Sequence, residues 1–164
     1  MKKLILTIAI LFCFVTLSFA ADGTVTGDAS QIYQSGPGDE IMRITYTVTF
    51  AADNNPPVEV ALNSILDTNG VKLPRLGGWW LLNIDTYPGT TAPTANTDFY
   101  LWSVDQKIDI LGGNGVDSID GAATYNTFFP LTSSRPLTGT EVFDVTDSNA
   151  VNSAVTYIVF TLYR

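Results

Sequence analysis

Apolar and polar residues alternate along much of this chain, and this period-two pattern restricts it to folds built from half-buried β-strands. Between positions 42 and 50, one arginine and three threonines alternate with five apolar residues: Met42, Ile44, Tyr46, Val48 and Phe50. We expect one face of this strand to lie in a core and the threonine-rich face to point outward. Beyond the first twenty residues, no segment longer than eight residues has helical periodicity.

The rest of the chain contains further strand candidates separated by turn-rich loops, at residues 58–62, 77–84, 99–104, 107–111, 140–145 and 154–163. The segment 77–84 is apolar on both faces for several residues, which indicates a strand covered on both sides. We expect the segments 99–104 and 107–111 to form a hairpin around Asp105 and Gln106. Seven or eight short strands predict an all-β fold: a single antiparallel β-sandwich, jelly-roll-like or immunoglobulin-like.

The first twenty residues have the organisation of a secretory signal peptide. Lys2 and Lys3 precede an apolar stretch at 4–16, and Ser18 and Ala20 are the small residues of a cleavage site. The chain therefore divides into a signal peptide, residues 1–20, and one β-sandwich domain, residues 21–164. An uncleaved anchor is the alternative, because the apolar run can be extended to about eighteen residues.

The single cysteine, Cys13, lies inside this leader and follows Phe12, where a lipoprotein signal would have a small residue. The mature chain would contain no cysteine and hence no disulfide. Export without disulfides is typical of a bacterial periplasmic, cell-surface or extracellular protein.

The balance of charges excludes several classes of function. The whole chain has 8 Lys+Arg against 16 Asp+Glu, a formal net charge of −8. Removal of the leader leaves six basic residues and a net charge of −10. So acidic a protein is not expected to bind nucleic acid or, once the leader is removed, a membrane surface. The chain has no histidine, so catalytic triads and histidine-ligated metals are excluded.

A glycine- and aspartate-rich segment, residues 112–120, has the sequence Gly-Gly-Asn-Gly-Val-Asp-Ser-Ile-Asp. It matches the calcium-binding nonapeptide of parallel β-rolls. A calcium ion would take its ligands from Asp117 and Asp120, with Asp109 nearby. Such sites form between stacked repeats, and neither neighbouring nonapeptide repeats the pattern. We therefore favour a glycine-rich turn in which Asp117 caps its own backbone, and we expect no other cofactor.

Two further groups of residues are candidate sites. The aspartates at 105, 109, 117 and 120 lie close together in the sequence, and a glycosidase needs two opposed carboxylates. A solvated acidic rim is the interpretation that we favour, so we expect no enzymatic activity. Trp79, Trp80 and Trp102 could form an aromatic surface for glycan, and packing in the core is the favoured alternative.

One pattern in the second half of the chain resembles a known group of proteins. Residues 87–98 read Tyr-Pro-Gly-Thr-Thr-Ala-Pro-Thr-Ala-Asn-Thr-Asp, and residues 108–113 read Ile-Asp-Ile-Leu-Gly-Gly. A late turn, Asn-Ala-Val-Asn-Ser-Ala at 149–154, precedes the last strand. Together these resemble small bacteriophage and prophage virion proteins of undefined role. The resemblance covers residues 77–164 and implies a virion-associated structural role, with no active residues to transfer.

The sequence therefore leaves two alternative functions. The first is a non-enzymatic structural protein that assembles with itself or with a larger protein assembly, as a virion-like or extracellular surface component. The second is an exported binding module for glycan or calcium, which would use the 112–120 loop or exposed tryptophans.

Overall fold

The computed structural model describes residues 23–34, 40–51, 60–93, 97–103, 108–119, 121, 125–130, 136–146 and 153–164. Over these residues the protein is all-β, with nine strands and one short 3-10 helix, η1 (Leu62–Ser64). The strands are β1 (Thr24–Gln34), β2 (Glu40–Thr49), β3 (Val60–Ala61), β4 (Trp80–Pro88), β5 (Asp98–Ser103), β6 (Ile108–Asp109), β7 (Asn126–Phe128), β8 (Val142–Thr146) and β9 (Val155–Tyr163).

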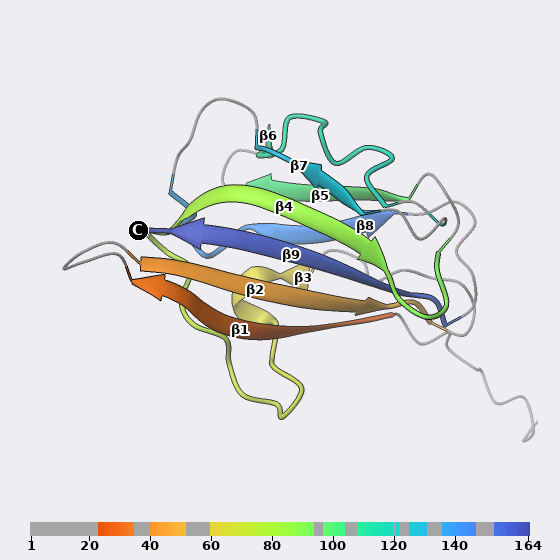
Figure 1. Ribbon diagram of the computed structural model, residues 1–164, viewed down its shortest axis with the longest axis horizontal. Helices are drawn as coiled ribbons and strands as arrows, with labels where there is room; N and C mark the ends of the chain where they lie inside the picture. Colours follow the sequence, from red (N-terminus) through yellow and green to blue (C-terminus); the bar gives the residue numbers. More distant parts are fainter. Residues whose placement is uncertain are drawn as a thin grey trace, which may run out of the picture.

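The strands form two antiparallel sheets, which are stacked so that the five-stranded one lies in front in Figure 1. The front sheet has the order β1-β2-β9-β4-β7, and the rear sheet has the order β3-β8-β5-β6. The predicted all-β sandwich is confirmed.

The pairing of the strands identifies the kind of sandwich. β2 pairs with β9, β3 with β8, β4 with β7 and β5 with β6, all antiparallel. These nested pairs form one long ribbon that is folded back on itself between β5 and β6. Further pairing of β4 with β9 and of β5 with β8 closes the rolled ribbon into two sheets. This is a jelly roll, with β1 added beside β2 as an extra edge strand.

The core lies between the sheets and contains the inward-facing residues of both. All five apolar residues of the 42–50 segment are buried, as the alternation predicts. One of the five, Tyr46, belongs to a cluster of four aromatic rings. Tyr46 packs against Phe143 and Phe160, and these two and Phe99 contact one another, with centroid distances of 4.8–6.4 Å throughout the cluster. Such tilted and edge-on pairs add to the stabilisation that burial alone provides.

Three features of the sheets differ from the expectations. Strands β1 and β7 were not predicted from the sequence, although β1 pairs with β2 along almost its whole length. Strand β4 has a bulge between Leu81 and Asn83. The bulge leaves Leu82 41% exposed, so the prediction that both faces of this segment are covered is wrong at that point. Farther along β4, three consecutive residues are buried: Ile84, Asp85 and Thr86.

In the described part of the chain, no helix has the length and apolar character needed to cross a membrane.

Candidate functional site

The two strands of the hairpin predicted around Asp105 and Gln106 pair antiparallel as β5 and β6, where Trp102 lies opposite Asp109. The turn itself lies outside the described residues. The Asp109 carboxylate accepts three backbone N–H bonds. Its Oδ1 bonds Leu101 at 3.3 Å and Leu111 at 3.0 Å, and its Oδ2 bonds Gly113 at 2.7 Å. Asp109 is only half-buried, but both of its carboxylate oxygens accept hydrogen bonds from the backbone, and these bonds position the start of the 112–120 loop.

The other residues of this loop also have structural explanations. Gly112 and Gly113 have φ values of 60° and 86°, which side-chain-bearing residues adopt at a cost. Asp117 has a φ of 51°, is exposed, and donates its backbone N–H to Oδ1 of Asp98 at 2.7 Å. Asp105 and Asp120 lie outside the described residues. Among the residues described, no three Asp, Glu, Cys or His side chains are grouped closely enough to hold a metal ion.

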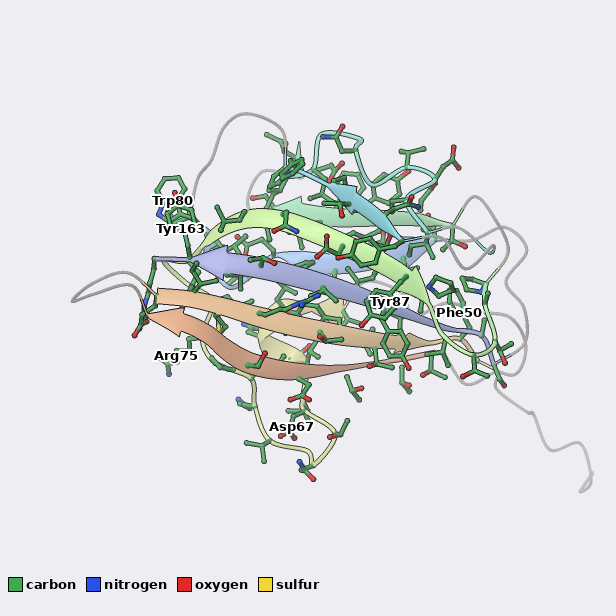
Figure 2. The ribbon with its side chains drawn as sticks, in the orientation of Figure 1. Phe50, Asp67, Arg75, Trp80, Tyr87 and Tyr163 are labelled. Carbon is green, nitrogen blue, oxygen red and sulfur yellow. The ribbon has the colours of Figure 1, made fainter. Side chains whose placement is uncertain are left out.

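The three tryptophans do not share one surface. Trp79 is buried beneath the Arg164 guanidinium, which lies 4.6 Å from its ring centroid. Trp80 belongs to β4 in the front sheet and stacks on Tyr163 (Figure 2). Trp102 belongs to β5 in the rear sheet and donates its Nε1–H to Asp144 at 3.0 Å. A single glycan surface built from all three is therefore excluded.

The outer face of the front sheet carries a row of tyrosines that sequence reasoning missed. Tyr87 lies between Tyr157, at a centroid distance of 4.9 Å, and Tyr125, at 6.1 Å, with the rings nearly parallel. Desolvation raises the pKa of Tyr125, and a hydrogen bond to Asp85 raises it further. Because Tyr87 stacks on a neighbouring ring at each side, the row offers few free ring faces to a sugar.

Asp85 lies in the same face and is almost fully buried. Its Oδ1 accepts hydrogen bonds from Asn83 and Thr127, at 3.1 and 2.8 Å, and its Oδ2 lies 3.9 Å from the Arg43 guanidinium. This carboxylate joins β2, β4 and β7 across the sheet. The arrangement therefore stabilises the sheet.

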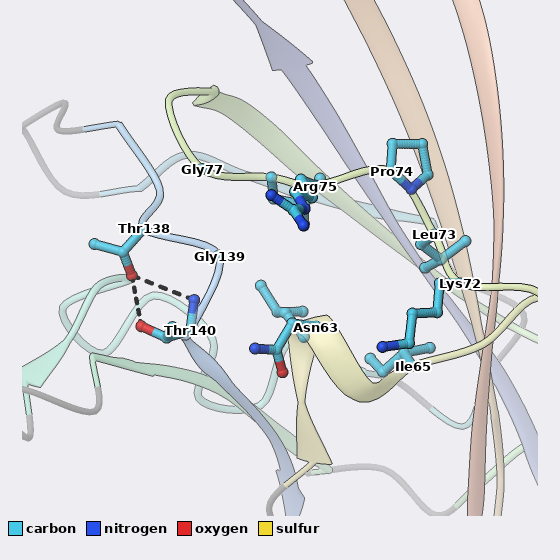
Figure 3. Close-up of a pocket in the computed structure, with 12 residues that line it drawn as sticks. Asn63, Ile65, Lys72, Leu73, Pro74, Arg75, Gly77, Thr138, Gly139 and Thr140 are labelled. Carbon is cyan, nitrogen blue, oxygen red and sulfur yellow. Dashed lines mark hydrogen bonds between the residues drawn. The ribbon is translucent and has the colours of Figure 1, made fainter.

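The candidate binding site is a cavity of about 470 Å³ between two loops at one side of the sandwich (Figure 3). The first loop follows η1 and extends to β4, and the second precedes β8. The cavity is lined by Leu62, Asn63, Ile65, Lys72, Leu73, Pro74, Arg75, Leu76, Gly77, Thr138, Gly139 and Thr140. Its volume lies within the range of sites for small molecules, roughly 300–1,000 Å³.

The first loop is positioned by a tight hairpin. Leu66 and Lys72 pair across it, and Oδ1 of Asp67 accepts the N–H groups of Asn69 and Val71 at 2.8 and 2.7 Å. These backbone bonds, the one from Val71 above all, lower the pKa of Asp67. The turn closes at Asn69-Gly70, and Gly70 has a φ of 78°. The hairpin thereby fixes where the Lys72 side chain leaves the backbone.

The second loop is held against the first by close backbone contact. A Cβ on Gly77 would lie 3.1 Å from the Thr138 carbonyl oxygen, so these two segments touch where glycine leaves room. The buried Glu141 carboxylate accepts the Thr138 and Gly139 N–H groups at 2.6 and 2.8 Å. The Glu141 carboxylate therefore bonds to the backbone of its own loop, and these bonds fix the position of the loop that forms this wall of the cavity.

Two cations face this cavity, and its described lining contains no acidic residue. Arg75 and Lys72 project into the space beside Asn63 in Figure 3. Sequence reasoning missed the site because Lys72 and Arg75 look like ordinary surface residues. The sequence feature that could have indicated the site is the position of Lys72 and Arg75, two of the few basic residues of the chain, on either side of Leu73-Pro74.

Comparison with protein-family models, with curated proteins and with solved structures gives no match for this chain.

Proposed function

We propose that this protein is a non-enzymatic structural component that assembles with further copies of itself, as part of an extracellular surface or a virion-like particle. The observation that carries the proposal is an exposed apolar edge at β7. Phe129 is 64% exposed and Tyr125 is 56% exposed, at either end of this three-residue edge strand.

The 112–120 loop lies beside β7 and extends this apolar edge. Asn114 donates its Nδ2–H to the Phe129 carbonyl at 2.8 Å, which ties the loop to the strand, and the same loop carries Val116 with 46% exposure. Exposed apolar side chains gathered at one edge are typical of protein–protein contacts. An edge strand with a free side can also pair with a strand from another copy.

The arrangement of the carboxylates supports a non-enzymatic role. Asp85, Asp109 and Glu141 each accept two or three hydrogen bonds from the sheets and loops that they stabilise. A general acid or base needs an oxygen that can reach a substrate. The leader at 1–20 supports export to the periplasm, the cell surface or the medium.

Light scattering coupled to size-exclusion chromatography tests the proposal over a range of protein concentrations. We expect a concentration-dependent oligomer that a Tyr125→Ser, Phe129→Ser double variant dissociates. Val71→Ser is the control, since Val71 is 60% exposed on the Asp67 hairpin, which lies on the opposite side of the molecule from β7 (Figures 1 and 2). A protein that stays monomeric at millimolar concentration, or an oligomer that Val71→Ser disrupts equally, would contradict the proposal.

A further inference from the structure

The cavity described above differs from the rest of this acidic protein in its charge. The structure describes four basic residues, and two of them are paired with carboxylates: Arg43 with Asp85, and Arg164 with Glu40. The other two, Lys72 and Arg75, have no carboxylate within ion-pair distance among the described residues, and both line the cavity. The free positive charge of the described residues is therefore concentrated at one hollow.

The remaining lining residues indicate what kind of anion would fit. Leu62, Ile65, Leu73 and Leu76 provide an apolar wall, whereas the Asn63 amide and the Thr140 hydroxyl can hydrogen bond to hydroxyl groups. This combination suits a molecule that has an apolar face, several hydroxyls and one anionic group. A pyranose ring with a carboxylate has these three properties.

The chemistry of the donors favours a carboxylate over a phosphate. Phosphate sites in loops are commonly built from several free backbone N–H groups. In the second loop, the Thr138 and Gly139 N–H groups already donate to Glu141. The anion would be held by the planar fork of Arg75, which matches a carboxylate, and by the point charge of Lys72.

We infer that this cavity binds a sugar acid, with its carboxylate on Arg75 and Lys72 and its ring against the leucine and isoleucine wall. The inference does not rest on assembly through β7, and it involves none of the residues at that edge. The contacts at Gly77 and Gly139 and the Asp67 hairpin hold both loops in place without a ligand. Little ordering is then required on binding, which favours affinity.

Isothermal titration calorimetry with glucuronate, glucose and inorganic phosphate tests this inference. We expect glucuronate to bind about tenfold or more tightly than glucose, because only glucuronate offers the carboxylate to Arg75. Binding should weaken as the salt concentration rises from 0.05 to 0.5 M, since both cations are exposed to solvent. Equal affinity for glucose and glucuronate, or no binding of 20 mM glucuronate, would overturn the inference.

Variants locate the binding. Arg75→Gln and Lys72→Gln should each reduce glucuronate affinity about tenfold. Lys72→Arg is the matched control, because it keeps the charge in the same place, and its affinity should stay within about threefold of the parent protein. Both positions are exposed, so all variants should fold, which their melting temperatures check. Unchanged affinity in both glutamine variants would refute the site, and phosphate binding as tight as glucuronate would refute the sugar acid.

Discussion

Gly115 lies directly against the backbone of Phe99. The Phe99 N–H donates to the Gly115 carbonyl at 2.8 Å, and a Cβ on Gly115 would stand 2.9 Å from the Phe99 carbonyl carbon and closer still to its oxygen. The contact fastens the 112–120 loop onto β5, beside the core. The contact also gives a structural reason for glycine at position 115, which the calcium-binding pattern contains as well.

Gly115→Ala should therefore be strongly destabilising. Because the added methyl group meets main-chain atoms, the loop or β5 has to move, and we expect a loss of about 3 kcal/mol in the free energy of unfolding. Gly113→Ala is the matched control in the same loop. A Cβ at Gly113 meets nothing within 4 Å, so only its φ of 86° opposes alanine, at about 1 kcal/mol. Urea denaturation measures both, and equal losses would contradict the close contact.

The alternation in β2 predicts opposite outcomes for neighbouring residues. Ile44 is fully buried between the sheets, so Ile44→Ala should cost about 2–5 kcal/mol. Thr45 belongs to the outer face, and Thr45→Ala should change stability by no more than about 0.5 kcal/mol. Denaturant titrations of both variants provide the measurement. Similar losses at the two positions would mean that the register of β2 is misassigned.

Denaturant titration should show that Asp109 contributes to stability without any metal, whereas Asp117 does not. Asp109→Ala removes the acceptor of three backbone N–H groups and should cost about 2 kcal/mol. Asp117→Asn should stay within about 0.5 kcal/mol, because the Asp117 side chain is exposed.

A chelator should leave the melting temperature of the protein unchanged. A calcium site would behave differently, since calcium at about 100 times its dissociation constant adds roughly 2.7 kcal/mol. For a domain of this size the melting temperature would then rise by several degrees. A calcium-dependent rise that Asp117→Asn abolishes would replace the turn interpretation with a calcium site.

The Tyr46 hydroxyl is buried in the core and has no hydrogen-bond partner among the described residues. Removal of this unpaired polar group in Tyr46→Phe should raise stability at pH 7 by about 1 kcal/mol. Tyr100→Phe is the control, because the Tyr100 hydroxyl donates to Oδ2 of Asp98 at 3.2 Å and its loss should not stabilise. Thermal denaturation distinguishes the two, and a destabilised Tyr46→Phe variant would point to a partner for this hydroxyl.

The same hydroxyl makes stability sensitive to alkaline pH. Burial raises the pKa of Tyr46 far above its ordinary value of 10.0, and the charge of Glu141 raises it further. Below pH 10 both folded and unfolded states keep the proton, so stability is unaffected. Above pH 10 only the unfolded state releases it, and the free energy of unfolding should fall by up to about 1.4 kcal/mol per pH unit. Tyr46→Phe should make this fall less steep, whereas an unchanged slope would contradict the burial.

The leader, which lies outside the described residues, gives a separate prediction. Ser18 and Ala20 are the well-placed small residues after the apolar stretch, so the exported protein should begin at Ala21. N-terminal sequencing of protein from the native host checks this. Material that begins at Met1 would instead support the uncleaved anchor.

Local patterns in the sequence were sufficient for the elements whose inward and outward faces differ. The strand at 42–50, the final strand and the hairpin around Asp105 all occur close to their predicted positions, because alternation is a property of consecutive residues and needs no distant partner. The all-β class followed directly from these segments.

The tertiary structure alone decided the strand order, the added strand β1 and the cavity. The interior of β1, Gly27-Asp28-Ala29-Ser30, has only small residues at its more buried positions, so its apolar alternation is too weak to predict a strand. It is a strand because β2 offers it a hydrogen-bonded edge. The jelly roll, in place of an immunoglobulin-like sandwich, depends on pairs such as β2 with β9, which are about a hundred residues apart. Lys72 and Thr140 face one cavity for the same reason: contacts between distant segments are formed by the folded chain, and no local pattern encodes them.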